Sequence, residues 1–318
     1  MMWEDFLCDP VKAAFVIFGL KLDAFQSARL RYYWWVPKVI DSSGFSSGKT
    51  IVDWAFANLR CLLLPDQAVG VYYPVFETGK NSFWQYYRTI TAPIFRAQMG
   101  RMDEEGAEGN SKTEGSACFK AFFRNGNTLF MPAPSFMKAA QTQASLRFNT
   151  LLVEEWTHID AGSTGIDDQL IGRVTRPSWN QHHPIWGNHL LFTAPAKTRM
   201  HPGARRLKAS ERRVKRGAPD YACLSYSYKD YSDRPCHTGK SFAEEYRIHG
   251  TIETKKNVTS RGEWLGEGLG IWGSHATGWF TEEAIQQAVA HGRARNVVPV
   301  LGRAMWESVH AQAAGKTN

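Results

Sequence analysis

The sequence lacks any apolar run long enough to cross a bilayer. The longest run, Ala13–Leu20, is interrupted by Gly19 and bounded by lysines, well short of the roughly 20 residues that a spanning helix needs. Acidic residues precede it, whereas a secretory signal would carry basic residues there. We therefore expect a cytoplasmic protein that makes no membrane contact.

Cysteine is also scarce. The chain has five cysteines, an odd number, and no two of them stand close enough for a CxxC metal or redox pair. We expect free thiols, most of them in the core. The 318 residues are 43% hydrophobic and 21% charged, which excludes a disordered or fibrous chain and suggests about two domains.

Acidic residues are almost absent from one short segment, which carries the excess positive charge. Between Lys197 and Arg216 there are nine Lys or Arg residues and one acid, Glu211, and the rest of the chain holds equal numbers of each sign. Such a patch can neutralise phosphates of a nucleic acid. A solvated helix face or a basic docking loop explains it equally well.

Strand-like and helix-like stretches alternate along most of the chain, which predicts an α/β fold with a mainly parallel central sheet covered by helices. Asn125-Gly126 predicts a hairpin turn. Asp103–Gly115 has no large apolar residue and predicts a loop. Tyr221–Tyr228 has strand character, and Ser241–Gly250 has helix character.

The most specific motif follows a predicted strand at 36–40 and precedes a predicted helix that starts at Thr50. It reads Ser43-Gly44-Phe45-Ser46-Ser47-Gly48-Lys49-Thr50. Such a loop offers backbone N–H groups to phosphates, its lysine reaches the β- and γ-phosphates, and its hydroxyl ligates Mg²⁺. We therefore expect ATP and Mg²⁺ to bind here, with Lys49 as an exposed loop side chain. Ser43 departs from the pattern, because a glycine is usual at that position.

Two adjacent acids follow the apolar strand candidate at 149–153. A phosphate loop needs one carboxylate to hold the shell of Mg²⁺ and another to polarise the attacking water. We expect Glu154 to hold the metal and Glu155 to act as the base. A strand end that simply faces water is the alternative.

These residues resemble the large terminase subunit, the motor ATPase that packages DNA into phage capsids, over most of the chain. The resemblance rests on the motifs above and on Leu22-Asp23-Ala24-Phe25-Gln26, Phe192-Thr193-Ala194-Pro195 and Arg261-Gly262-Glu263-Trp264. It implies a P-loop NTPase fold of the RecA/ASCE type. It also implies that Gln26 reads adenine and that Thr193 belongs to a coupling motif that senses the γ-phosphate.

The resemblance further implies partners, namely double-stranded DNA, a portal protein, a small terminase subunit and further copies of the chain in a ring. The setting would be the bacterial host cytoplasm. The basic segment would then contact DNA or dock on the portal. Its candidate DNA-binding residues are Arg205, Arg206, Lys208, Arg212 and Arg213.

Three departures from the family pattern stand out. Glu154 replaces the usual aspartate, and Phe45 stands where many terminases have an arginine. The positive charge that stabilises the transferred phosphoryl group must then come from another residue. We favour Arg147, acting in its own chain or in a neighbouring subunit. No aspartate follows Asp233, so the two-metal carboxylate cluster of a nuclease is not expected.

We expect a P-loop ATPase domain over 1–220, a lid or linker subdomain over 221–280 and a C-terminal helical tail over 281–318. The leading hypothesis is an ATP-hydrolysing motor that translocates viral DNA into a procapsid. The alternatives are a helicase-like or other DNA-dependent ATPase, and a non-hydrolysing module that docks on DNA or a partner.

Overall fold

The computed structural model describes residues 3–89, 93–105, 118–132, 147–158, 174, 185, 187–194 and 202–272. The tail expected over 281–318 lies outside these ranges. The chain divides into two compact units. Unit 1 comprises Met1–Ile40, Gly48–Ala194 and Arg216–Ala222, and unit 2 comprises Asp41–Ser47, Pro195–Lys215 and Cys223–Asn318.

The described residues form a sheet with strand order β3-β4-β5-β2-β6-β7-β1-β8. Its strands are β1 (Lys38–Asp41), β2 (Ala68–Tyr72), β3 (Met99–Glu105), β4 (Cys118–Phe123), β5 (Thr128–Pro132), β6 (Thr150–Glu154), β7 (His189–Thr193) and β8 (Tyr221–Leu224). β2 pairs in parallel with β5 and β6, and β6 pairs in parallel with β7. β4 pairs antiparallel with β3 and β5. The predicted mainly parallel α/β sheet is confirmed.

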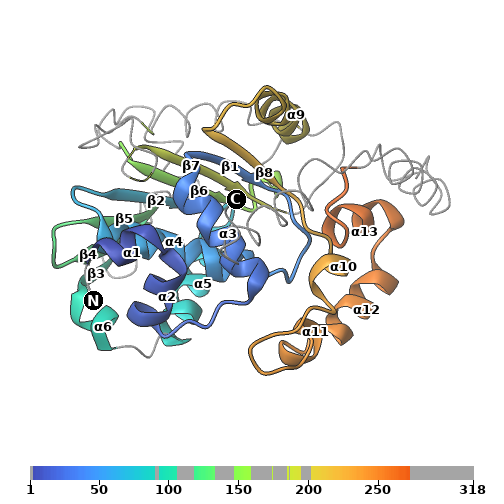
Figure 1. Ribbon diagram of the computed structural model, residues 1–318, viewed down its shortest axis with the longest axis horizontal. Coiled ribbons are helices and arrows are strands. Elements are labelled where there is room, and N and C mark those ends of the chain that lie inside the picture. Colours follow the sequence, from blue (N-terminus) through green and yellow to red (C-terminus); the bar gives the residue numbers. More distant parts are fainter. Residues whose placement is uncertain are drawn as a thin grey trace, which may run out of the picture. The chain divides into compact units, whose positions relative to one another are not determined.

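Figure 1 shows the helices of unit 1. They are α1 (Trp3–Cys8), α2 (Pro10–Phe18), α3 (Ala24–Trp35), α4 (Lys49–Leu63), α5 (Phe76–Thr89) and α6 (Pro93–Gln98), followed later by the 3₁₀ turn η1 (Trp156–His158). α4 packs on α3 and against β2, β5 and β6. Its side chains at helical spacing, Val52, Phe56 and Leu59, are fully buried, so the apolar pattern places α4 against the sheet.

Local sequence sets where these helices begin. Asp23 caps α3 by accepting hydrogen bonds from the N–H groups of Phe25 and Gln26. Gln26 returns the bond, because its amide oxygen accepts from the N–H of Asp23 at 3.1 Å. This reciprocal capping box satisfies N–H groups that the first turn of a helix leaves unpaired.

Unit 2 carries the helices α9 (Pro202–Lys215), α10 (Tyr228–Tyr231), α11 (Phe242–Glu245), α12 (His249–Val258) and α13 (Arg261–Glu267). Serine caps recur here, and Ser260 forms a capping box with Glu263 at the start of α13. Among the described residues, no helix is both long and apolar enough to span a membrane.

The hairpin at Asn125-Gly126 is confirmed, since β4 and β5 are antiparallel and Gly126 adopts φ 86°. Three local expectations are wrong. Asp103–Glu105 extends β3, because backbone pairing with β4 outweighs the loop-like composition. The strand expected over 221–228 ends at Leu224. The helix expected over 241–250 is broken at Arg247, whose φ of 51° no α-helix accommodates.

Candidate nucleotide site

The N-terminus of α4 is built to receive an anion. The helix begins at Lys49, directly after Gly48, and no side chain caps it. Uncapped N–H groups at a helix start, together with the helix dipole, favour phosphate. Thr50 is exposed, whereas Lys49 is only 7% exposed. The expectation of an exposed lysine was wrong, because the fold buries its side chain.

Position 48 requires glycine for two reasons, the backbone conformation there and a close neighbouring side chain. Gly48 adopts φ 72°, and an added Cβ would lie 2.4 Å from Nε2 of Gln26. The predicted adenine reader therefore lies directly against the phosphate loop. The amide oxygen of Gln26 accepts a hydrogen bond in the capping box of α3. In this conformation the Nε2 end of Gln26 therefore faces the loop.

The acidic motif and the coupling motif meet at one edge of the sheet. Glu154 ends β6, Thr193 ends β7, and the two residues are paired in the parallel register. Both side chains are buried, at 2% and 1% exposure. Because the carboxyl ends of parallel strands share an edge, this is where α/β folds bind ligands. The structure thus brings together two residues that the sequence places 39 positions apart.

Sequence reasoning missed a third member of this group, Asp53. It lies three residues after Thr50 on α4 and is 1% exposed. The hydroxyl of Thr193 donates to Oδ2 of Asp53 at 3.0 Å. An aspartate on the buried side of an apolar helix was the available signal, because a buried carboxylate needs polar partners.

The pKa of Glu154 is held well above its usual range. Burial is the main cause, followed by the negative charge of Asp53 and a hydrogen bond with it. Oε1 of Glu154 is buried and has no hydrogen-bond partner among the described residues. An oxygen in this state is suited to a cation, and the oxygen donors of Glu154 and Thr50 are of the type that Mg²⁺, a hard ion, prefers.

The candidate base, Glu155, has an unusual backbone. Its φ is 50°, in the left-handed region that side chains other than glycine rarely occupy. The side chain is half-buried. Backbone strain of this kind persists where the surrounding structure imposes it, and it clusters at functional sites.

The first half of the phosphate loop belongs to unit 2 and is tied to that unit. The N–H of Ser42 donates to the carbonyl of Leu224, and the N–H of Gly44 donates to that of Tyr226. The hydroxyl of Ser43 accepts from the N–H of Tyr226 at 3.0 Å. This bond gives a physical reason for serine where the family pattern has glycine.

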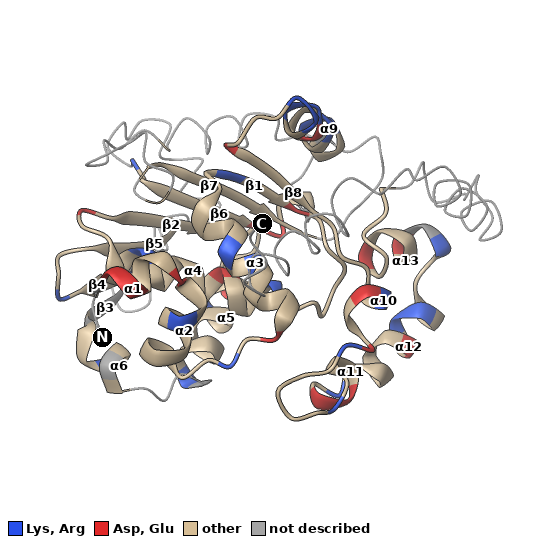
Figure 2. Cartoon of the chain, in the orientation of Figure 1, with Lys and Arg blue, Asp and Glu red and all other residues tan. Residues whose placement is uncertain are grey.

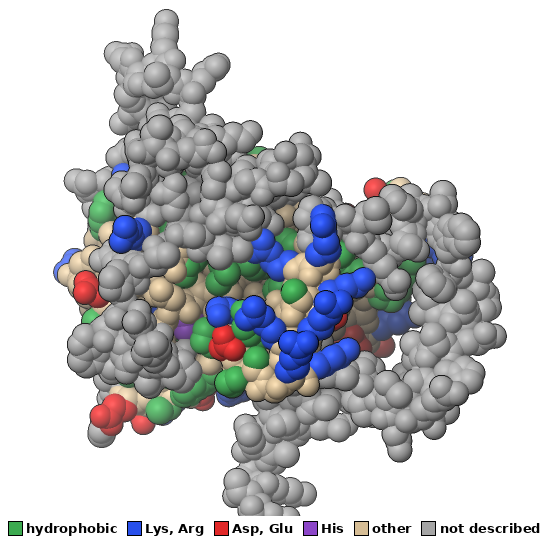
Figure 3. All heavy atoms as spheres, turned by 90° about the horizontal axis from the view of Figure 1, so that it is seen from above, with side chains coloured by type: hydrophobic (Ala, Val, Ile, Leu, Met, Phe, Trp, Pro, Cys, Tyr) green, Lys and Arg blue, Asp and Glu red, His purple; other side chains and the backbone are tan. Residues whose placement is uncertain are grey.

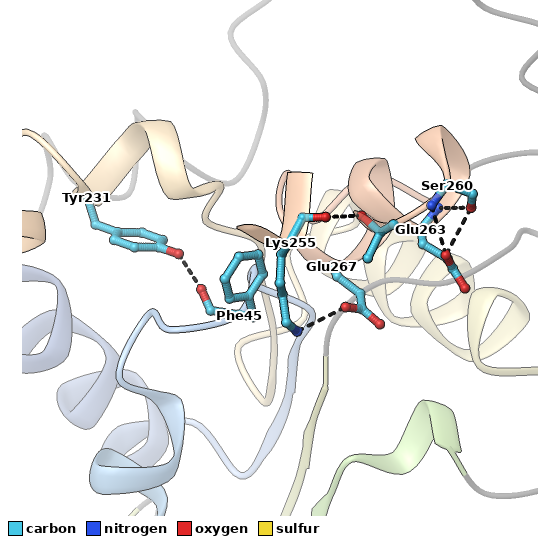
Figure 4. A network of polar contacts seen from close by, with 7 residues as sticks. Phe45, Tyr231, Lys255, Ser260, Glu263 and Glu267 are labelled. Atoms are coloured by element: carbon cyan, nitrogen blue, oxygen red, sulfur yellow. Dashed lines mark hydrogen bonds and ion pairs between the residues drawn. The ribbon is translucent and has the colours of Figure 1, made fainter. Parts of the chain in front are cut away.

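Phe45 is an anchor for this half of the loop (Figure 4). Nζ of Lys255 lies 4.4 Å from the centre of its ring, and Lys255 in turn pairs with Glu267 at 3.1 Å. The backbone of Phe45 donates to the carbonyl of Glu267 and accepts from the hydroxyl of Tyr231. A position that carries a catalytic cation in the family pattern is used here for packing.

The structure does not bring Arg147 to the edge where the acids lie. Arg147 is exposed and precedes β6, whereas Glu154 ends the same strand. At ~3.3 Å per residue the two are on the order of 20 Å apart. A role at the phosphate site of its own chain has no support from this geometry, and a role in a neighbouring subunit stays a prediction.

Residues 202–215 of the basic segment form α9, which Figure 2 shows carrying Lys and Arg along much of its length. Gly203, Ala204, Leu207 and Ser210 are its buried residues, whereas Arg206 is half-buried. Its exposed basic residues are Arg205, Lys208, Arg212, Arg213 and Lys215. Figure 3 shows a band of Lys and Arg side chains on the face seen from above, the side on which α9 is drawn.

No protein-family model and no curated protein matches this sequence. Solved structures match by fold. The HK97 bacteriophage large terminase has a TM-score of 0.53 at 14% identity, over 85% of this chain and 55% of that chain. The large terminase of a thermophilic bacteriophage has a TM-score of 0.52 at 11% identity, over 80% of this chain and 54% of that chain.

The isolated ATPase domain of the Thermus phage P74-26 large terminase, in a variant form, gives a TM-score of 0.51 at 11% identity. The match covers 83% of this chain and 99% of that domain. This chain thus spans about half the length of the two longer terminases. At such identities the likeness shows the fold alone, and that fold is the one of the ATPase domain of phage large terminases.

Proposed function

We propose that this chain is an ATP-hydrolysing motor domain that moves double-stranded DNA into a viral procapsid. The observation that carries the proposal is the cluster at the carboxyl edge of the sheet. There Thr193, Glu154 and Asp53 meet beside the uncapped start of α4. Likeness of fold to phage large terminase ATPase domains supports the same function.

In this proposal each residue at the phosphate loop has a separate task. Residues 43–48 hold the phosphates with backbone N–H groups, and Lys49 neutralises charge on the transferred phosphoryl group. Thr50 and Glu154 would hold Mg²⁺, which spreads the developing negative charge when bound. Glu155 orients the attacking water and takes its proton.

The proposed partners follow from the motor function. α9 would contact the phosphate backbone of DNA, and further copies of the chain would form a ring on a portal protein, assisted by a small terminase subunit. The setting would be the cytoplasm of a bacterial host. Gln26 would contact the adenine, and Thr193 would sense the γ-phosphate.

Phosphate release from ATP, measured with and without duplex DNA, tests the enzymatic part. Wild-type protein should hydrolyse ATP faster with DNA, and Lys49→Ala should abolish turnover, because the lysine's charge has no substitute in the loop. Because Lys49 is buried, circular dichroism of the variant is the control for folding. ATP binding without turnover in the wild-type chain would favour a non-hydrolysing module.

The DNA part is tested by neutralising Arg205, Lys208 and Arg212 to glutamine. Affinity for duplex DNA should fall without sequence preference, and the log–log salt slope should flatten by up to ~0.9 for each DNA phosphate that the variant no longer neutralises. The control variant neutralises Lys240 in the turn before α11, Lys256 on α12 and Arg261 on α13. It has the same change in net charge and should bind DNA like the wild type. An unchanged slope with impaired ring or portal assembly would indicate docking instead.

A further inference from the structure

Asp53 is a buried acid that no sequence motif accounts for. It lies on the same turn of α4 as the residues that the proposed function assigns to phosphate and metal. A carboxylate that is 1% exposed loses its water shell, so its surroundings must supply hydrogen bonds. One such bond comes from Thr193 at the end of β7.

Two neighbours of Asp53 are residues that the proposed function needs at fixed positions. Oδ2 of Asp53 accepts from the Thr193 hydroxyl at 3.0 Å, and the negative charge of Asp53 is near enough to Glu154 to raise the pKa of that residue. Thr193 and Glu154 sit opposite each other in the register of β6 and β7. Asp53 therefore links α4 to both strand ends.

A second set of polar contacts lies next to the group formed by Asp53, Thr193 and Glu154. Tyr73 is near enough to Glu154 to affect the pKa of that carboxyl, and its hydroxyl donates to the hydroxyl of Ser82 on α5 at 3.3 Å. The indole of Trp54 donates to the same Ser82 hydroxyl at 2.8 Å. Since Trp54 is the next residue after Asp53, these contacts lead back to α4.

We propose that Asp53 is a positioning residue that holds the Thr193 hydroxyl and the Glu154 carboxyl together, so that the metal-binding strand end and the coupling strand move as one body. The inference rests on the proposed ATPase function. Asp53 acts through these two neighbours and does not itself touch the nucleotide.

The experiment is a double-mutant cycle between Asp53→Ala and Thr193→Val. Thr193→Val should lower kcat about tenfold, and Asp53→Ala should lower it at least as much, because it removes the same bond and the contact with Glu154. The double variant should therefore lose no more than Asp53→Ala alone. Thr193→Ser keeps the hydroxyl and Asp53→Asn keeps an acceptor for it, so these variants should stay within about threefold of wild type. Affinity for a fluorescent ATP analogue, titrated with and without Mg²⁺, should depend less on Mg²⁺ in Asp53→Ala.

Asn58→Ala is the matched control, since Asn58 is buried on the same helix and its amide donates to the backbone of Trp54. It should lower the melting temperature and leave kcat unchanged. Additive losses in the cycle, or Asp53 variants that lose stability but keep the Mg²⁺ dependence of binding, would overturn the proposal. If Asp53→Ala does not fold, the comparison of Thr193→Val with Thr193→Ser and Asp53→Asn decides.

Failure of the proposed ATPase function would give results different from those that would overturn the role of Asp53. In that case wild-type protein hydrolyses no ATP, and Lys49→Ala binds the analogue as tightly as wild type. A hydrolysing wild type whose Asp53→Ala and Thr193→Val variants keep full kcat would reject the role of Asp53 alone.

Discussion

Glu155 places a candidate catalytic carboxylate on a strained backbone. Its φ of 50° costs a residue with a Cβ ~1–2 kcal/mol, and glycine avoids that cost. The residue follows a buried strand whose last member, Glu154, is held in register with Thr193 of β7. The strain is consistent with a backbone that must turn sharply to present Glu155 beside its neighbour.

Replacing Glu155 with glycine should therefore separate stability from activity. The free energy of unfolding should stay level or rise by up to about 1 kcal/mol, because relief of strain outweighs the extra chain entropy of glycine. ATP turnover should fall at least ~100-fold, since no base remains. Urea unfolding and phosphate release measure the two effects.

Asp66 offers a control for this prediction. Its φ is 58°, close to that of Glu155, and it is exposed in the turn between α4 and β2. Asp66→Gly should give a similar gain in stability and leave turnover unchanged. A large loss of stability in Glu155→Gly would show that the side chain, rather than the backbone, holds this turn.

Glu154 should make stability depend on pH. Because its pKa in the folded protein is raised, mainly by burial, the stability that the protonated carboxyl contributes is present at low pH. It is lost as pH rises through the folded-state pKa. Glu154→Gln cannot ionise, so without Mg²⁺ its advantage in melting temperature over wild type should grow between pH 6 and pH 8.5.

The size of this effect depends on how far the folded-state pKa of Glu154 lies above its pKa in the unfolded chain. Thermal unfolding of both proteins across that pH range measures it. Saturating Mg²⁺ and ATP should reduce the difference, because a bound cation removes the cost of the buried charge. A pH-independent difference would mean that Glu154 is ionised throughout.

At the scale of elements, the first half of the phosphate loop is packed by the helices of unit 2. The close approach is visible at Gly44, where an added Cβ would lie 2.4 Å from the carbonyl oxygen of Gly268. Phe45 is 9% exposed and lies edge-on to Trp264. The sequence of this loop is thus adapted to its own packing surface as well as to phosphate.

Placing an arginine at position 45 should consequently destabilise the protein. Phe45→Arg would place a second cation beside Lys255 and empty the space of the ring, at a cost of about 2–4 kcal/mol. Adding Lys255→Met should recover part of the loss. Lys255→Met alone should cost less than about 1 kcal/mol, because its pair with Glu267 is partly exposed.

Chemical denaturation of the two single variants and the double variant measures this coupling. Equal stability of Phe45→Arg and wild type would mean that this half of the loop does not depend on the ring. An increase in kcat with unchanged stability would mean that the arginine can reach the phosphates after all.

At the scale of the whole molecule, the proposed ring gives Arg147 a test. If its side chain completes the site of a neighbouring subunit, Arg147→Ala and Glu155→Gln should each be inactive alone. Mixed together, they should recover part of the wild-type turnover, because an intact phosphate site then meets an intact arginine. Turnover measured across mixing ratios, with DNA present, reports this recovery.

Two outcomes would reject that role. Mixtures with no more activity than the inactive variants would mean that Arg147 does not act between subunits, provided that the mixed ring assembles. Full activity of Arg147→Ala alone would mean that it is an ordinary surface arginine. Lys49→Ala mixed with Glu155→Gln is the matched control, since both variants damage their own site and should not complement each other.

The sequence alone determined the features that depend on residues near one another in the chain. The loop at 43–50, the apolar spacing of α4 and the turn at Asn125-Gly126 follow from local rules of backbone conformation and helix periodicity. Hydrophobic alternation along the chain was enough to indicate the α/β class. These patterns involve residues that are close together in the chain, so they can be recognised from the sequence without a structure.

Only the tertiary structure decided which distant residues meet. Asp53 and Thr193 are 140 positions apart, and Tyr231 reaches Phe45 across 186. The structure also places Arg147 at the far end of β6 from Glu154. Burial explains why such facts escape the sequence, because the same aspartate, phenylalanine or arginine is solvated, packed or paired according to what the fold places against it.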